Sequence, residues 1–362
     1  MVTKKKWSVI LVGILIVVMF VSLTRLSARA SEKKSPLPRT LTIATLPRGS
    51  ANNALGAAIA KVLTTKLGVQ ATDRPSGGYG RFIPLADRGE MDMAISSANS
   101  PYNAITGQFI FKNSPLYNLR VLATANPLMA TWAAGKKSGV KTWADMKGKR
   151  IAISKTMGGG SGYLRNKVVF KYYGLDIEKD FIQVPIPSFP AGTKALMGGR
   201  VDVAYAAVGA PATRETANAL GGLNWLFETE EQVDAIRDDL INAGVLPAKL
   251  QCFEGLRGMP KKSCFGLGAN VFMGNRTLSE EHAYLIVKTL WENIKDIQAA
   301  HPAFRLWNRE IGFVRPQADQ GGIYHPGAIR FYKEVGKWTD EAEKQNQWLI
   351  EQMERSKKKH GK

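Results

Sequence analysis

A run of small residues, Gly158-Gly159-Gly160-Ser161-Gly162, is the strongest local sign of binding chemistry in this sequence. It stands between a predicted strand and a predicted helix, where free backbone N–H groups and the helix dipole favour an anion. No Lys-Ser/Thr pair follows it, Leu164 and Arg165 interrupt any dinucleotide motif, and Tyr163 replaces the last glycine of a hydrolase elbow. A tight turn with positive φ would explain the run equally well, so alone it is a weak signal.

Three further loops of small or polar residues follow predicted strands at comparable places. Gly49-Ser50-Ala51-Asn52-Asn53 precedes a predicted helix, where its side chains can cap that helix or hold a ligand carboxylate. Ser96-Ser97-Ala98-Asn99-Ser100 follows another strand, and Ala207-Val208-Gly209-Ala210-Pro211 offers backbone groups after a third. Ligands of open α/β sheets bind beyond the carboxyl ends of the strands, so these loops predict a shared site. Arg48 or Arg165 is its expected source of positive charge.

These loops require strands and helices that alternate twice in the same order. The first unit is predicted to have strands at 41–45, 69–72, 91–96 and 119–125, and the second at 150–154, 181–184 and 201–205. Lone strands are expected at 129–134 and 267–273, and late helices at 279–300, 326–336 and 340–356. This pattern predicts an α/β protein of two lobes with a double crossover between them.

The N-terminal segment has the pattern of a secretory signal. Three lysines precede an uncharged run over 7–24, and Ala28-Arg29-Ala30 has the form of a signal-peptidase site. We expect 1–30 to be a signal peptide, with an uncleaved anchor as the alternative, and 31–38 to be a tether. The 362 residues carry 50 Lys and Arg against 30 Asp and Glu, a net charge of +20. Five of these positive charges lie in the leader, so +15 would remain in an exported body that never meets chromosomal DNA.

The cysteine and histidine pattern argues against a metal site. Cys252 and Cys264 are the only cysteines, and in an oxidising compartment such a pair is expected to close one loop as a disulfide, with two buried free thiols as the alternative. The four histidines show no ligand spacing with each other or with the cysteines, so we expect neither a metal nor another cofactor.

Taken in order along the chain, several motifs resemble the TAXI family, the extracytoplasmic solute receptors of TRAP transporters. Its Gly-Thr-Tyr-Tyr-Pro-Leu-Gly segment is similar to residues 49–56 here, and its Tyr-His-Pro-Gly-Ala segment is close to residues 324–328. Four shorter similarities are found at Ser76-Gly77-Gly78-Tyr79, Ser96-Ser97-Ala98, Gly160-Ser161-Gly162-Tyr163 and Gly209-Ala210-Pro211. Asn52 and Asn53 replace the paired tyrosines of the family, which predicts a wider and more polar pocket.

The resemblance implies a type II periplasmic-binding fold, in which two α/β lobes joined by a two-strand hinge close a cleft around the ligand. Lobe 1 would comprise 39–130 with 268–362, and lobe 2 would comprise 131–267. It implies a periplasmic monomer that is not an enzyme, binds a small organic anion such as a dicarboxylate or glutamate, and delivers it to TRAP permease subunits. The residues expected to bind the ligand are Arg48, Ser50, Ala51, Asn52, Gly78, Tyr79, Ser96, Ser97, Asn99, Trp132, Gly160, Ser161, Gly162, Tyr163 and Gly209.

Two other classes of function stay open at this point. An exported enzyme would need a base for Ser161, and no histidine or acid is paired with it in the sequence. A membrane-tethered sensory domain would need the N-terminal run to stay uncleaved. Trp132 also has an alternative interpretation, as a core tryptophan rather than a wall of the cleft.

Overall fold

The computed structural model describes residues 37–154, 161–243, 251–254, 259, 261–265, 269–310, 312–314 and 322–361. The chain separates into Met1–Pro38 and Arg39–Lys362, and all elements named below belong to the second part. The predicted signal peptide lies outside the described residues. None of the helices in the described ranges combines the length and apolar character needed to cross a bilayer.

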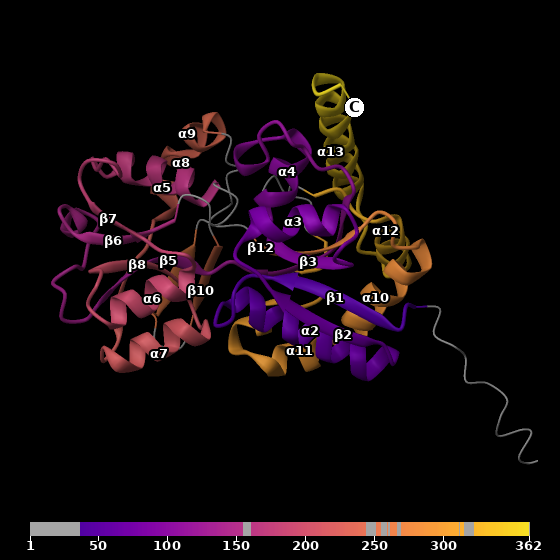
Figure 1. Cartoon of the computed structure of the whole chain (residues 1–362), viewed down its shortest axis with the longest axis horizontal. Helices are drawn as coiled ribbons and strands as arrows, with labels where there is room; N and C mark the ends of the chain where they lie inside the picture. Colours follow the sequence, from indigo (N-terminus) through magenta and orange to yellow (C-terminus); the bar gives the residue numbers. More distant parts are fainter. Residues whose placement is uncertain are drawn as a thin grey trace, which may run out of the picture. The chain divides into compact units, whose positions relative to one another are not determined.

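The first sheet has five strands in the order β2-β1-β3-β12-β4. β1 is parallel to both β2 and β3, whereas β12 is antiparallel to β3 and β4 (Figure 1). All seven residues of β12 are buried, as expected for a strand inside a sheet with covered faces. Its strands are β1 (Thr40–Thr45), β2 (Gln70–Pro75), β3 (Met93–Ser97), β4 (Leu119–Pro127) and β12 (Ala269–Asn275).

The second sheet repeats this arrangement with the order β7-β6-β8-β5-β9. β6 is parallel to β7 and β8, and β5 is antiparallel to β8 and β9. Each sheet therefore contains one inner antiparallel strand that comes directly after a crossover from the other sheet. The strands are β5 (Ala130–Gly135), β6 (Arg150–Ile153), β7 (Ile182–Pro185), β8 (Val203–Ala207) and β9 (Leu223–Leu226), and a separate hairpin is formed by β10 (Gln251–Glu254) and β11 (Lys262–Phe265).

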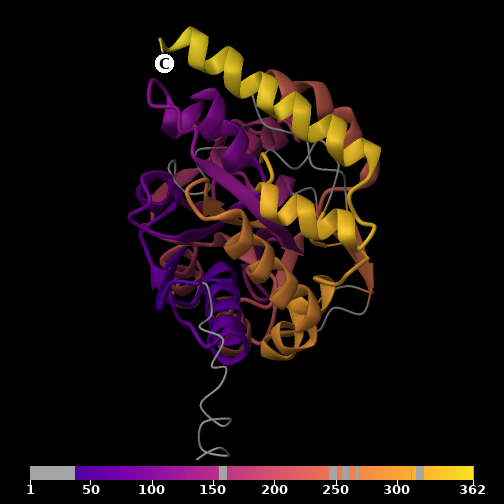
Figure 2. The same ribbon diagram turned by 90° about the vertical axis from the view of Figure 1, so that its right-hand side faces the viewer.

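Helices follow the strands and pack on the sheets. In α2, Gly56 allows close approach to β1, because a Cβ there would lie 2.3 Å from Thr45 Cγ2. α13 packs against α4 (Figure 2). The rings of Tyr102 and Trp348 stack there with centroids 5.8 Å apart. The helices are α2 (Ala51–Leu67), α3 (Tyr79–Asp87), α4 (Asn99–Thr106), α5 (Ser161–Tyr172), α6 (Phe189–Met197), α7 (Pro211–Ala219), α8 (Glu230–Ala235), α9 (Arg237–Asn242), α10 (Glu280–Glu292), α11 (Ile294–Ala300), α12 (Pro326–Glu334) and α13 (Asp340–Lys359), with 3-10 turns η1 (Phe109–Phe111), η2 (Ala144–Met146) and η4 (Pro302–Leu306).

The predicted alternation of strands and helices is present, and the late helices differ from the prediction at one point. The single helix expected over 279–300 is divided at Asn293 into α10 and α11. Asn293 has φ −110° and ψ 26°, and its side-chain amide donates to the Thr289 carbonyl, a local hydrogen bond that competes with the regular helix. The alternation of strands and helices also predicts a mostly parallel sheet, and in the first sheet β1, β2 and β3 are parallel while β12 is antiparallel to its neighbours.

Candidate functional site

A cavity of about 120 Å³ lies where the elements of the first and second sheets meet. Most of the side chains around it are small or apolar. Among the described lining residues, Arg165 is the only Lys, Arg, Asp or Glu. The lining comprises Leu46, Gly49, Ser50, Ala51, Asn52, Tyr79, Ser97, Ala98, Asn99 and Asn270 from the first-sheet side, Leu128 and Ala130 from the crossover, and Gly162, Arg165, Phe189, Pro190, Thr193, Tyr205, Ala207, Ala210, Ala212 and Thr213 from the second-sheet side.

The N-terminal turns of six helices contribute to this lining. Residues at or beside the starts of α2, α3 and α4 line one side, and first-turn residues of α5, α6 and α7 line the other. Each of these helices has eight residues or more, and each carries partial positive charge at its N-terminus. The described wall is therefore electropositive through its backbone, although it contains one charged side chain. Such a wall favours an anion or the negative end of a dipole.

Ser50 and Asn52 are largely engaged within the protein. Ser50 Oγ accepts from the Asn53 amide at 3.1 Å and donates to the Pro47 carbonyl at 2.7 Å, so it caps α2. Asn52 Oδ1 accepts from the Leu46 amide at 2.8 Å, and its Nδ2 donates to the Ile95 carbonyl at 3.1 Å. Both residues line the cavity, but these bonds make their first role that of fixing the loop after β1.

A second polar group lies at the start of α3 and at the end of β3. Burial raises the pKa of the Tyr79 hydroxyl, and its hydrogen bonding to Ser97 offsets only part of this effect, so the phenol is neutral. The hydroxyls of Ser97 and Ser100 are 3.0 Å apart. Asn99 Oδ1 is buried and has no hydrogen-bond partner within the described part of the chain. It is therefore an unsatisfied acceptor in a residue that lines the cavity.

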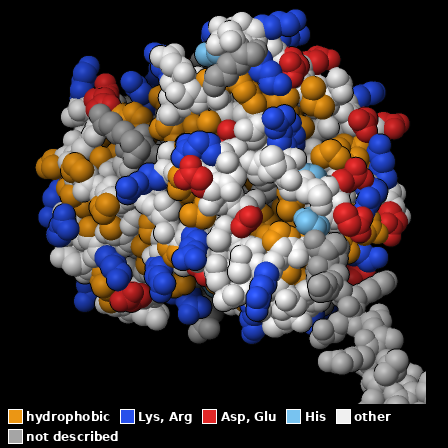
Figure 3. Space-filling view, turned by 45° about the vertical axis from the view of Figure 1, so that its right-hand side comes forward, with side chains coloured by type: hydrophobic (Ala, Val, Ile, Leu, Met, Phe, Trp, Pro, Cys, Tyr) orange, Lys and Arg blue, Asp and Glu red, His pale blue; other side chains and the backbone are white. Residues whose placement is uncertain are grey.

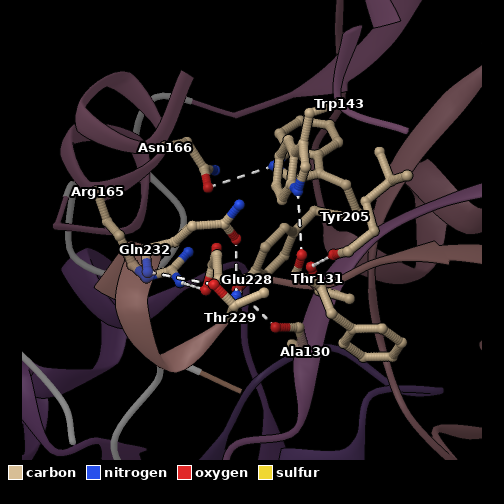
Figure 4. A network of polar contacts seen from close by, with 12 residues as sticks. Ala130, Thr131, Trp143, Arg165, Asn166, Tyr205, Glu228, Thr229 and Gln232 are labelled. Carbon is tan, nitrogen blue, oxygen red and sulfur yellow. Dashed lines mark hydrogen bonds and ion pairs between the residues drawn. The ribbon is translucent and has the colours of Figure 1, made fainter. Parts of the chain in front are cut away.

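Arg165 forms a buried ion pair with Glu228, and both residues are only 5% exposed. Arg165 Nη2 lies 2.5 Å from Glu228 Oε2 (Figure 4). Burial by itself lowers the pKa of Arg165, but the charge and hydrogen bond of Glu228, together with Tyr205 and Tyr173, raise the pKa above its ordinary value, so the guanidinium stays charged. Among the described residues, Arg165 Nε and Glu228 Oε1 have no hydrogen-bond partner. The pair thus keeps one donor and one acceptor unused.

Neighbouring bonds hold the loop that carries Glu228. Thr229 and Gln232 form a capping box at the start of α8, with Gln232 Oε1 accepting from the Thr229 amide at 2.7 Å (Figure 4). Trp143 Nε1 donates to the Phe227 carbonyl at 3.1 Å, and Thr131 Oγ1 donates to the Leu226 carbonyl. Because these bonds flank Glu228 on both sides, they fix its carboxylate beside Arg165.

Two contacts connect the start of α7 to elements of the first-sheet side. The Ala212 amide donates to the Gly49 carbonyl at 3.3 Å. His301 Nδ1 accepts from the Ala303 amide at 3.1 Å, so Nε2 carries the proton and donates to the Gly209 carbonyl. Gly209 has φ +76°, and a Cβ at this position would lie 2.8 Å from His301 Cε1. We call these two contacts the α7 contacts.

The structure brings many of the predicted site residues together at this cavity. Ser50, Ala51, Asn52, Tyr79, Ser97, Asn99 and Gly162 line it, as does Arg165, one of the two expected charges. Ser161 begins α5, and its side chain, like the whole of Gly160, lies outside what the structure describes. Gly209 is adjacent to the lining residue Ala210.

Besides Gly209, five predicted residues are not among those that line the cavity. Trp132 is 1% exposed in the core beside the second sheet, so the alternative interpretation as a core residue holds for it. Tyr163 binds Glu178 through its hydroxyl, and Ser96 is buried with its Oγ donating to the Ser97 carbonyl at 3.1 Å. Arg48 is exposed, and Gly78 precedes α3 with φ 144°.

Several residues that line the cavity are not predicted by the sequence. Phe189 and Pro190 start α6 after β7, which is the carboxyl end of a strand, and this position could have identified them. Tyr205 and Asn270 lie inside strands, and the pattern of the sequence does not show which strand face meets the other sheet's elements. Glu228, the partner of Arg165, follows β9, which the sequence analysis did not predict.

The two cysteines are paired in register by the backbone. Cys252 and Cys264 are directly opposed in the antiparallel β10–β11 hairpin. This placement is compatible with the predicted disulfide, which stays a prediction. Within the described residues, no group of three or more His, Cys, Asp or Glu side chains is arranged to hold a metal ion.

Comparison with protein families gives a match to the NMT1-like family over residues 43–336. The chain belongs to the NMT1-like family. Two solved structures share its fold at low sequence identity. The R. palustris protein Rpa4515, determined with adipate, is 14% identical over 90% of this chain and 98% of its own, with a TM-score of 0.51. A structure described as a periplasmic transporter is 14% identical over 86% and 94%, with a TM-score of 0.50. This NMT1-like protein thus has the two-sheet α/β fold of periplasmic binding proteins.

Proposed function

We propose that this NMT1-like protein is the extracytoplasmic solute-binding component of a membrane transporter and that it captures a small organic anion without chemically changing it. The observation that carries the proposal is the convergence of six helix N-termini and the buried Arg165 on one cavity. Backbone dipoles of this kind stabilise a bound anion by fixed partial charges that need no reorganisation. The fold shared with the adipate-bound R. palustris protein supports the same role.

The proposed mechanism is closure of two lobes around the ligand. The lobes are 39–130 with 268–362 and 131–267, and their crossover runs from β4 through Leu128 and Met129 into β5. Small backbone rotations in such a short connection are enough for hinge closure. Ligand between the helix N-termini would then be enclosed by both lobes, and the α7 contacts would hold the closed form.

In finer detail, we propose a carboxylate ligand, such as a dicarboxylate or an amino acid, and a TRAP-type permease driven by an ion gradient. The TAXI-like motifs at 49–56 and 324–328 support the type of transporter. The single positive side chain in the described lining supports one principal anionic group. The protein would be exported by cleavage of residues 1–30 and would act as a monomer.

A ligand screen tests binding directly. The mature protein is heated with and without adipate, succinate, glutamate, 2-oxoglutarate and a set of sulfonates, and its unfolding is followed. A ligand present at about a hundred times its Kd stabilises the folded state by about 2.7 kcal/mol. The absence of any shift across the anion panel would argue against the proposal, and neutral sugars provide the comparison group.

Transport energetics test the TRAP assignment. In cells that depend on this protein for uptake of the identified ligand, dissipating the ion gradient with an ionophore should stop accumulation while ATP is maintained. Accumulation that persists under the ionophore and stops on ATP depletion would assign an ATP-driven transporter instead. Sequencing the N-terminus of the native protein tests export, with Ser31 as the expected first residue.

A further inference from the structure

Three of the described lining residues each carry one buried polar atom that lacks a hydrogen-bond partner among the described residues. These atoms are Arg165 Nε on the second-sheet side, and Asn99 Oδ1 and Asn270 Oδ1 on the first-sheet side. Folded proteins rarely leave such atoms unpaired, because each loses its hydration without compensation. One of these atoms is a donor and two are acceptors. A ligand that satisfies all three must therefore carry a hydrogen-bond donor as well as a negative charge.

The network around Asn270 fixes which end of its amide is unused. Asn126 Nδ2 donates to the Pro127 carbonyl at 3.1 Å, which leaves Asn126 Oδ1 as the acceptor of a bond from Asn270 Nδ2 at 3.3 Å. Turning the Asn270 amide over would place two oxygens against each other. Asn270 must therefore keep its carbonyl oxygen as the free group, and it is 1% exposed.

The backbone at Asn270 is irregular in a way that suits a site residue. The register between β12 and β4 shifts between Ala269 and Val271, so Asn270 falls at a break in the ladder. On the other side, Asn270 is directly opposite Ser97, which also lines the cavity. Bulges of this kind disrupt the ladder locally and re-aim side chains at binding sites.

The charges at the cavity determine which of the three atoms an anionic group of the ligand can use. Arg165 donates to Glu228 through Nη2, so its positive charge is largely balanced and only Nε–H is left for an acceptor. An anionic oxygen can use this donor together with the helix N-termini. It cannot use Asn270 Oδ1 or Asn99 Oδ1, because an oxygen anion brings no hydrogen to an acceptor.

We propose that Asn270, assisted by Asn99, is a specificity-determining residue that selects anions which also carry an N–H or O–H donor. The anionic group lies toward Arg165, and an amino, hydroxyl or amide substituent of the same ligand donates to Asn270 Oδ1. This inference rests on the proposed function as an anion receptor. It adds that an anion lacking a donor leaves the amide acceptors unpaired and binds more weakly.

The test compares matched ligands on the full mature protein by calorimetry. The pairs share a carbon skeleton and differ in one substituent: succinate with malate and aspartate, glutarate with glutamate, and adipate with 2-aminoadipate. At least one donor-bearing member should bind about tenfold or more tightly than its unsubstituted partner, which corresponds to one well-made hydrogen bond to a buried acceptor. Equal affinities within every pair that binds would overturn the inference and leave the proposed anion receptor intact. No binding by any member would remove both.

Two variants test whether the side-chain amides of Asn270 and Asn99 cause the preference for donor-bearing anions. Asn270→Leu keeps the side-chain size and should remove most of the preference by weakening the donor-bearing ligand, with a change of about twofold or less for its partner. Asn99→Leu, at a half-buried position, should give a smaller loss and serves if the substitution in β12 prevents folding. Asn224→Leu is the matched control, because Asn224 lies outside the described cavity lining and donates to the Val140 carbonyl at 2.9 Å, and it should leave the preference between the two ligands unchanged. A preference that is unchanged in both Asn270→Leu and Asn99→Leu contradicts the assignment.

Discussion

The pairing of Arg165 with Glu228 determines how much positive charge the cavity presents. Taking two charges out of water is costly, and breaking such a pair leaves one of them buried and uncompensated. Arg165→Met should therefore destabilise the protein by about 3–5 kcal/mol and abolish anion binding, because it removes the donor at the cavity as well. Urea unfolding and calorimetry on the same preparations measure the two effects.

The double variant Arg165→Met/Glu228→Leu separates these effects. Replacing both partners by apolar side chains removes the buried charge, so most of the lost stability should return. Anion binding should not return. Recovery of binding in the double variant would show that Arg165 does not contact the ligand.

Glu228→Gln gives the opposite result for binding. The glutamine keeps the shape and one acceptor oxygen but leaves the Arg165 charge uncompensated, so the cavity gains a net positive charge. We expect tighter binding of anions with a second negative group, by about tenfold, together with lower stability in the absence of ligand. An affinity for dianions that falls in this variant would contradict the balancing role of Glu228.

At the scale of elements, the alternation of residues predicted most strands within a few positions. Strands such as β1, β3 and β8 are short apolar runs that end in polar or glycine-containing loops, and this local chemistry is visible in the sequence. The same reasoning placed Ser50, Ser97 and Asn99 at one site. It could not place Asn270 or Glu228, because their roles depend on contacts between residues more than sixty positions apart.

The contact of His301 with the Gly209 carbonyl makes the stability of the fold sensitive to pH. Burial lowers the pKa of His301 more than its bond to Gly209 raises it, and Arg214 lowers the pKa further. The pKa of a histidine in the unfolded chain is about 6.5. Around and below this pH the unfolded chain therefore binds the proton more readily than the folded protein does. Stability from this residue is complete above that pH and is lost as pH falls through the lowered value in the folded state. A proton on Nδ1 would also oppose the Ala303 amide.

We therefore expect His301→Asn to flatten the decrease in melting temperature between about pH 7 and 5. Asparagine can accept from the Ala303 amide in place of Nδ1 but has no group that titrates in this range. His325, whose pKa burial also lowers, remains in this variant, so part of the slope will persist. A wild-type slope in His301→Asn would contradict the assignment.

The β10–β11 hairpin tests the expected oxidising compartment. Because Cys252 and Cys264 are opposed in register, we expect the native exported protein to resist thiol alkylation until it is reduced. Closing a loop of this length contributes about 2–4 kcal/mol, so the double Cys→Ser variant should unfold at lower denaturant concentration. Full alkylation of the native protein without reductant would leave two free thiols as the correct interpretation.

At the scale of the whole molecule, the excess of positive charge is a property of the surface rather than of the described cavity lining. Lys and Arg side chains are scattered among acidic and apolar ones on the face shown in Figure 3. Once the five positive charges of the leader are removed from the +20 of the whole sequence, the remaining +15 produces a field that extends about one Debye length into solution. Such a field attracts a small anion before any contact forms, whereas the bound state depends on Arg165 and the helix N-termini.

Because the surface charge attracts the anion and the cavity holds it, we expect the association and dissociation rate constants to depend differently on salt. Between about 0.01 and 0.15 M salt the Debye length falls from about 30 to 8 Å, so the association rate constant of an identified anion should decrease several-fold. The dissociation rate constant should change little, because the cavity is shielded from the solution. Stopped-flow measurements at several salt concentrations give both values. A salt effect found only in dissociation would place the electrostatic attraction inside the cavity and would contradict attraction by the surface as a whole.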